Sequence, residues 1–122
     1  MTCRLALAAT LLIAAPALAR DDRVPAVTPI GDPVSCISTV GLRSQVRSDR
    51  VIDFTVAGRT YRNTLPQGCP GLGFERRFAY SLPQPRLCDV DIITVLQDPG
   101  LSGGPSCGLG RFQPVAPPRR TR

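Results

Sequence analysis

The chain has 122 residues and a formal net charge of +6, and every basic side chain is an arginine because the sequence contains no lysine and no histidine. This length supports one small domain, and a hydrophobic content of 43% is too high for a chain that is disordered throughout. The missing histidines exclude a Ser-His-Asp triad and a histidine metal site, and the missing lysines exclude a Schiff base and the lysine of a P-loop.

Residues 1–19 have the layout of a secretory signal peptide. Arg4 gives a short basic start, residues 5–15 form an apolar run, and Ala17 and Ala19 stand at the −3 and −1 positions of a cleavage site. We therefore expect export to the periplasm or the extracellular space. The apolar run is too short to span a bilayer, so we expect no transmembrane segment in the mature chain. The alternative is an N-terminal anchor or a buried helix.

Proline-rich segments flank the predicted domain. Residues 20–33 contain three prolines and little apolar periodicity, which predicts an extended linker. Residues 34–115 form the predicted β domain, and residues 116–122 form a basic, disordered tail. A domain of about 80 residues buries too little apolar surface to be stable by a wide margin without cross-links.

Cleavage after Ala19 removes one cysteine, and the four that remain lie in the predicted domain: Cys36, Cys69, Cys88 and Cys107. An even number of cysteines in a short exported chain predicts disulfides. Three connectivities are open. We favour Cys36–Cys107 with Cys69–Cys88, because the first bond would tie the two ends of the domain together. The cysteines are separated by 32, 18 and 18 residues, whereas zinc ligands usually come in close pairs, so we expect no metal and no cofactor.

A β-hairpin is predicted near the middle of the chain. Residues 51–56 alternate between two faces, and the pattern resumes after Ala57-Gly58 in residues 59–65. A two-residue loop would make two cross-strand pairs, an inner aromatic pair of Phe54 with Tyr61 and an outer ion pair of Asp53 with Arg62. A bulge at Gly58 would shift the register by one residue and break both pairs.

Further strands are predicted on both sides of this hairpin, at residues 42–47, 74–82, 91–96 and 109–115. Residues 91–96 are dense in β-branched side chains and form the best candidate for a central strand. Residues 69–72 suit a short helical turn. The aromatic side chains at strand spacing are predicted to belong to the core: Phe54, Tyr61, Phe74, Phe78, Tyr80 and Phe112. Together these segments predict an all-β fold, a small five- to six-stranded antiparallel barrel or sandwich stapled by two disulfides.

The same segments resemble a family of small exported bacterial proteins that is catalogued only as a domain of unknown function. The features that match are Cys36, Leu42-Arg43-Ser44, Asp49, Ile52-Asp53-Phe54, Tyr61-Arg62-Asn63-Thr64-Leu65, Cys69-Pro70-Gly71-Leu72, Leu87-Cys88, Asp91-Ile92-Ile93 and Cys107-Gly108-Leu109-Gly110. They cover nearly the whole predicted domain, and residues 61–74 are the most specific piece. The resemblance implies export to the cell envelope and a compact, cysteine-containing domain, and it implies no particular activity.

Two pairs of aspartates raise the alternative of a small hydrolase. Asp89 and Asp91 are two residues apart, and Asp49 and Asp53 precede and enter a predicted strand. Paired carboxylates can act as acid and base in glycoside hydrolysis, or they can bind Ca²⁺. Aspartates before strands commonly cap turns, however, so we name no catalytic residue.

The glycine-rich residues 100–104 are predicted to form a loop, because they match neither phosphate-binding glycine motif. This loop lies close to Cys107, a predicted disulfide residue. A third alternative is therefore a secreted, protease-inhibitor-like protein that presents residues 100–106 to a protease.

The arginines carry the one functional indication. Arg62, Arg76 and Arg77 are candidate anion-binding residues, because a guanidinium on a sheet face can bind phosphate or carboxylate in bidentate fashion. The alternative is compositional, with arginine at every basic position for reasons unrelated to binding. We predict a non-enzymatic binding or structural module of the cell envelope. Its expected partner is an unknown protein or an anionic envelope component such as lipid or glycan, and not nucleic acid.

Overall fold

The computed structural model describes residues 9–11, 24–97, 100 and 102–118. The described elements, in chain order, are β1 (Cys36–Ser38), β2 (Arg43–Val46), β3 (Val51–Val56), β4 (Arg59–Thr64), α1 (Leu72–Glu75), β5 (Phe78–Ala79), β6 (Arg86–Cys88), β7 (Ile92–Gln97), β8 (Ser102–Gly108) and β9 (Phe112–Val115). Most of the predicted signal peptide, the start of the predicted linker and the end of the predicted tail lie outside the described residues.

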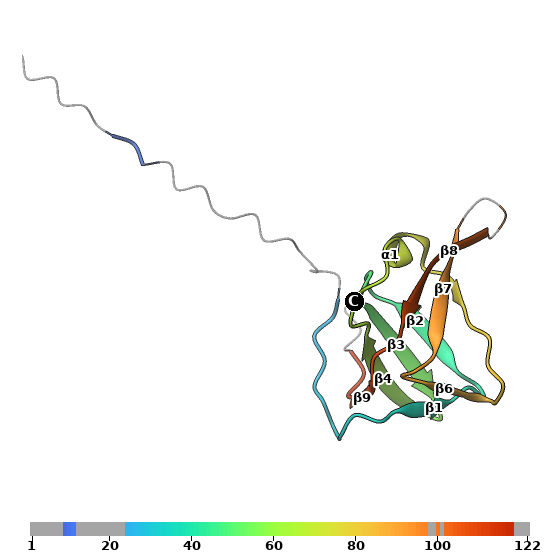
Figure 1. The fold of residues 1–122 in the computed structure, drawn as a ribbon. Helices are drawn as coiled ribbons and strands as arrows, with labels where there is room; N and C mark the ends of the chain where they lie inside the picture. The colour runs from blue at the N-terminus through green and yellow to red at the C-terminus, as the bar shows by residue number, and fades with distance from the viewer. Residues whose placement is uncertain (1–8, 12–23, 98–99, 101, 119–122) are drawn as a thin grey trace, which may run out of the picture.

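The strands pair antiparallel in three sheets, with the orders β2-β3-β4-β9, β5-β7-β8 and β1-β6. Figure 1 shows β7 and β8 crossing in front of β3 and β4, with α1 at one end of the domain and the β1–β6 pair at the other. The prediction of an all-β, antiparallel fold with two disulfides is confirmed. The prediction of a barrel of five or six strands is wrong, because the described strands number nine, form three sheets and do not close into a barrel.

The β3–β4 hairpin has the two-residue loop, which is one of the two alternatives that the sequence left open, and it has no bulge at Gly58. Ala57 (φ 51°) and Gly58 (φ 74°) both lie in the left-handed region, as a type I′ turn requires. The register therefore places Phe54 opposite Tyr61 and Asp53 opposite Arg62, and both predicted pairs form. This turn fixes which side chains of the hairpin face the core and which face outward.

The core lies between the sheets and takes side chains from most elements. Ile52 and Phe54 of β3 and Ile93 and Val95 of β7 are fully buried. Phe54 makes edge-to-face contacts with Phe112 and Phe78, with ring centroids 5.6 and 6.2 Å apart. Residues 91–96 are correctly predicted as a central strand, because β7 pairs with β5 on one side and β8 on the other.

The favoured disulfide pairing is wrong. The bonds are Cys36–Cys88 and Cys69–Cys107. Cys36 and Cys88 lie directly opposite each other in the β1–β6 pair. Both strands have only three residues, which is too short to show an alternating pattern, so the sequence analysis did not predict them.

We expect loss of the Cys69–Cys107 bond to lower the free energy of unfolding by about 2–4 kcal/mol, because the closed loop restricts the unfolded chain. The Cys69→Ala/Cys107→Ala double variant, measured in urea against the parent chain, tests this value. Peptide mapping without reduction provides the control for connectivity. A fragment that joins Cys36 to Cys107 would contradict the pairing described here.

The predicted strand at residues 74–82 is largely wrong. Residues 72–75 form α1, which is flanked by Gly71 (φ 86°) and Arg76 (φ 56°) in the left-handed region. Strand β5 contains only Phe78 and Ala79. Phe74 is consequently 87% exposed on α1 and is not a core residue. The prediction of a helical turn in this region is closer to the structure, although the turn lies about three residues later.

The predicted glycine-rich loop is also wrong in part, because residues 102–108 form strand β8. The pairing with β7 has an irregularity opposite residues 94–96. A Cβ atom on Gly104 would lie only 2.9 Å from the side-chain Cδ of Gln97. Gly104 therefore packs closely against the Gln97 side chain within a strand and does not belong to a loop. Residues 98, 99 and 101 lie outside the described residues.

Part of the segment predicted as a linker is held against the domain. Isolated bridges pair Pro29 with Val115 and Val34 with Phe112. The amide of Ile30 donates to Pro114 O at 3.0 Å, and the amide of Ala116 donates to Thr28 O at 2.9 Å. Residues 28–34 thus cover the otherwise free edge of β9.

Candidate functional site

Arginines gather on the outer face of the four-stranded sheet. In the register of β2, β3 and β4, side chains directly opposite one another point to the same side. Between β2 and β3, Arg43 lies opposite Thr55 and Gln45 lies opposite Asp53. Between β3 and β4, Thr55 lies opposite Thr60 and Asp53 lies opposite Arg62. Arg47 follows β2, and its amide donates to Val51 O at 2.8 Å, which continues the register. We call this surface the arginine face, and it comprises Arg43, Gln45, Arg47, Asp53, Thr55, Thr60 and Arg62.

Asp53 is the centre of the arginine face. Arg47 Nε donates to Asp53 Oδ2 at 2.9 Å, while Arg62 donates from Nε to Oδ1 at 2.8 Å and from Nη2 to Oδ2 at 3.0 Å. The Asp53 side chain is 4% exposed, and those of Arg47 and Arg62 are 18% and 13% exposed. The predicted ion pair therefore exists, but it is largely buried and involves two arginines. One carboxylate facing two guanidinium groups leaves an excess of one positive charge.

Arg62, a predicted anion-binding residue, uses each of its three guanidinium nitrogens for a hydrogen bond inside the protein. Besides its two bonds to Asp53, it donates from Nη1 to Pro25 O at 2.7 Å. Its three nitrogens thus all have internal acceptors. Arg62 positions the carboxylate of Asp53 and fastens residue 25 to the sheet, and it presents no free nitrogen of its own.

Arg47 and Arg43 are better placed to contact an anion. The Arg47 guanidinium contacts Asp53 through Nε, and within the described residues its two Nη atoms have no acceptor. Arg43 is exposed on β2, which is an edge strand, and so are its neighbours Gln45 and Thr55. A guanidinium held by a carboxylate at Nε still offers its Nη donors, which suits bidentate binding of a carboxylate or phosphate.

The other two predicted anion-binding residues lie elsewhere. Arg76 and Arg77 connect α1 to β5 and are exposed. Arg77 lies 3.8 Å from a carboxylate oxygen of Glu75, so part of its charge is offset. Neither residue belongs to the arginine face, since neither lies on a strand of the four-stranded sheet.

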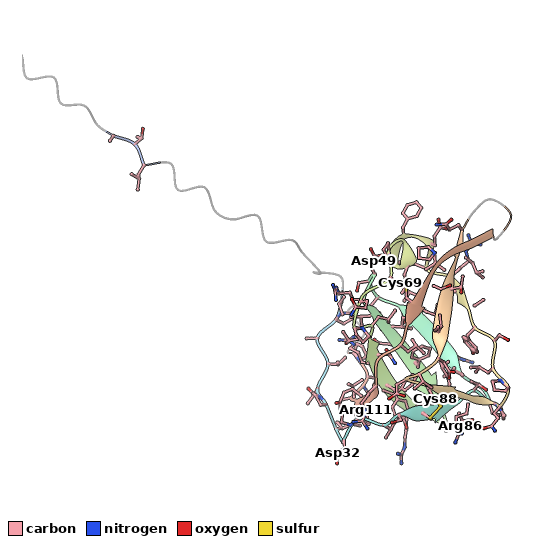
Figure 2. All side chains as sticks on the ribbon, viewed as in Figure 1. Asp32, Asp49, Cys69, Arg86, Cys88 and Arg111 are labelled. Atoms are coloured by element: carbon pink, nitrogen blue, oxygen red, sulfur yellow. A yellow bond between two sulfur atoms is a disulfide. The ribbon has the colours of Figure 1, made fainter. Side chains whose placement is uncertain are left out.

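The aspartates of the hydrolase alternative hold the backbone in place. Asp49 Oδ1 accepts from the Gly73 amide at 2.7 Å, which joins the β2–β3 turn to α1, and Asp91 Oδ2 accepts from the Cys88 amide at 2.6 Å. Figure 2 shows Asp49 and Cys69 at the α1 end of the domain and Cys88 toward the other end. Asp89 is partly buried after β6. Within the described residues, no three histidine, cysteine or acidic side chains gather as a metal site would need.

Residues 100–106, the loop of the inhibitor alternative, lie mostly in β8. Cys107 in the same strand is bonded to Cys69. Residues 102–106 are therefore part of a strand paired with β7, whereas this alternative assumed an exposed loop, and residue 101 lies outside the described residues. The part of the chain that the structure describes has no helix long and apolar enough to cross a membrane.

Comparison of the chain with protein-family models, with curated proteins and with solved structures found no match. The arginine face must therefore be judged from its own geometry. Arg62 and its pairing with Asp53 could be identified from the sequence, whereas Arg43 and Arg47 were not predicted as site residues. Their spacing of four residues, on a weakly alternating segment, would place them on one face of a strand, and this was the available signal.

Proposed function

We propose that this protein is an exported, non-enzymatic binding module of the cell envelope and that its arginine face binds a polyanion. The observation that carries the proposal is the Asp53 carboxylate, which fixes Arg47 through Nε and leaves its Nη donors without an acceptor among the described residues, on the same sheet face as the exposed Arg43. Two disulfides support an oxidising compartment, and the signal-peptide pattern of residues 1–19 supports export.

The spacing of the arginines favours a ligand with several charges. Arg43 and Arg47 are four residues apart along an extended segment, so their Cα atoms lie about 13 Å apart at about 3.3 Å per residue. A single phosphate or carboxylate could contact both arginines only if their side chains converged on it, whereas a polymer or a surface with repeated charges can meet each side chain where it lies. Anionic lipid headgroups and acidic glycans share this chemistry, and binding to either should weaken as salt screens the charges.

We expect the oxidised protein to bind at least one of two anionic probes at low salt. The probes are vesicles that contain phosphatidylglycerol and soluble polygalacturonate, with phosphatidylcholine vesicles as the neutral reference. The Arg43→Gln variant should bind the preferred probe about fivefold more weakly, since one arginine near an anionic surface contributes about 1 kcal/mol. Co-sedimentation measures binding of the protein to the vesicles, and isothermal titration calorimetry measures its binding to the glycan.

The matched control is Arg86→Gln, which removes the same charge from β6, outside the four-stranded sheet. Arg86 is exposed, and among the described residues its guanidinium donates only to the side chain of Gln84, at 3.2 Å. An equal loss in both variants would mean that net charge alone drives binding, and the assignment to the arginine face would be wrong. Absence of binding to both anionic probes at low salt would overturn the proposal itself.

A further inference from the structure

A groove opens where β5 and β7 separate. Strand β5 ends at Ala79, and the chain then diverges from the beginning of β7. The groove between them has a volume of about 530 Å³ and is open to solvent. The residues that line it are Ala79, Tyr80, Ser81, Val90, Asp91, Ile92 and Thr94.

The backbone of Ile92 faces this groove without a strand partner. The amide of Leu96 donates to Arg77 O at 3.0 Å, and Thr94 lies opposite Ala79, so the even-numbered residues of β7 direct their backbone groups toward β5. The next position in this register is Ile92, where β5 has already ended. Within the described residues, Ile92 has no backbone partner on that side, and its N–H and C=O are free to pair with another chain.

Apolar side chains surround this open piece of strand edge. Val90 is 83% exposed, Ile92 is 59% exposed and Tyr80 is 38% exposed. These three side chains all line the same groove. Strand addition combines backbone hydrogen bonds with pockets for alternate side chains, and both elements are present here.

The charge of the groove indicates the character of its ligand. Asp91 is the one charged residue among those that line it, although the chain as a whole carries a net charge of +6. Asp91 Oδ2 accepts from the Cys88 amide, which fixes the carboxylate, and Oδ1 has no partner within the described residues. A cationic side chain of a ligand would complement this carboxylate, whereas an anionic one would be repelled.

We propose that the groove binds an extended segment of a partner protein that alternates apolar and basic side chains. The segment adds a short antiparallel strand beside the beginning of β7 and pairs with the backbone of Ile92. Its apolar side chains contact Val90, Ile92 and Tyr80, and its basic side chain lies near Asp91. This inference is independent of the arginine face, because it involves a different sheet and the opposite sign of charge.

The test uses an acetylated and amidated hexapeptide of alternating valine and arginine as the probe. Added to the ¹⁵N-labelled, oxidised protein, it should shift the Ile92 amide resonance and those of neighbouring groove residues in a saturable manner. The same hexapeptide with N-methyl groups on the backbone nitrogens of its valines should cause much smaller shifts, because it cannot complete the strand pairing. A valine–glutamate hexapeptide should bind more weakly than the valine–arginine peptide.

Asp91→Asn is the matched protein variant, because an asparagine oxygen can still accept from the Cys88 amide. It should weaken binding of the valine–arginine peptide about two- to fivefold, as expected for an exposed ion pair, while Arg43→Gln should leave this binding unchanged. The proposal is wrong if the N-methylated peptide binds as well as its parent, or if no saturable shift occurs at Ile92. A shift of Ile92 that depends on protein concentration alone would identify a second copy of the chain as the occupant and would also overturn it.

Discussion

Replacing Asp53 with Ala should lower the free energy of unfolding by about 3–5 kcal/mol, because removal of one partner from a buried ion pair leaves charge uncompensated. Here two guanidinium groups, with side chains 18% and 13% exposed, would face each other without their shared carboxylate. Three hydrogen bonds would be lost at the same time. Urea unfolding of the oxidised variant and the parent chain measures the difference.

The loss should shrink in high salt, because mobile anions partly screen the repulsion between Arg47 and Arg62. Asp32→Ala is the matched control, since Asp32 is exposed and its side chain has no hydrogen bond or ion pair with the described residues, and it should change stability by less than about 0.5 kcal/mol. If Asp53→Ala costs no more than this control, the buried carboxylate does not stabilise the fold, and the geometry of the arginine face would need revision.

The second large effect concerns Asn63, which is fully buried in β4. Its Nδ2 donates to Gly110 O at 2.7 Å, and its Oδ1 accepts from the Gly110 amide at 2.8 Å. One side chain therefore satisfies both backbone groups of Gly110, which lies two positions before β9. The Asn63→Ala variant should lose about 2–6 kcal/mol, since two buried backbone groups would each lack a partner at a cost of about 1–3 kcal/mol.

Thermal and urea unfolding of Asn63→Ala can be compared with Gln113→Ala. Gln113 also donates from a side-chain amide to backbone carbonyls, those of Gly31 and Pro114, but it is only partly buried. We expect its replacement to cost about 1 kcal/mol, because water can replace the lost bonds. Equal losses of unfolding free energy in the two variants would show that burial does not make the hydrogen bonds of Asn63 more stabilising than those of Gln113. Gly110→Ala should also destabilise the protein strongly, because its Cβ would collide with Thr64 O.

Local patterns predicted those parts of the fold that depend on neighbouring residues. The β3–β4 hairpin was predictable because its alternation and its Ala57-Gly58 turn lie within fourteen residues of sequence. The density of β-branched residues likewise predicted β7. In both cases the residues that decide the structure are adjacent in the chain.

Long-range contacts explain the errors. Strands β1 and β6 exist as a pair of three-residue segments joined by Cys36–Cys88, and neither has a pattern of its own. Because these two strands were not predicted, the disulfide pairing was chosen only by the argument that one bond should tie the two ends of the domain together. That choice was wrong. Phe74 was assigned to the core by spacing, but the left-handed backbone at Gly71 and Arg76 bends the chain into α1 and turns Phe74 outward.

The candidate site was predictable only in its central pair. Opposition of Asp53 and Arg62 follows from the hairpin alone. The part played by Arg47 depends on how β2 aligns with β3, and the engagement of Arg62 depends on Pro25, which is 37 residues away in sequence. Burial of this pair by a distant segment converted an expected surface ion pair into an internal one.

The pairing of residues 28–34 with β9 determines how the domain would respond to mechanical tension. Because this pairing is antiparallel, a force that separates Thr28 from Ala116 would break their hydrogen bond first, then the Ile30–Pro114 bond and then those between Val34 and Phe112. Separation of the segment would next reach Cys36, whose disulfide to Cys88 would transmit the force directly, so that residues 37–87 would bear no tension. Strands β2, β3 and β4, with the arginine face, would thus be shielded from a pull that peels off the flanking segment.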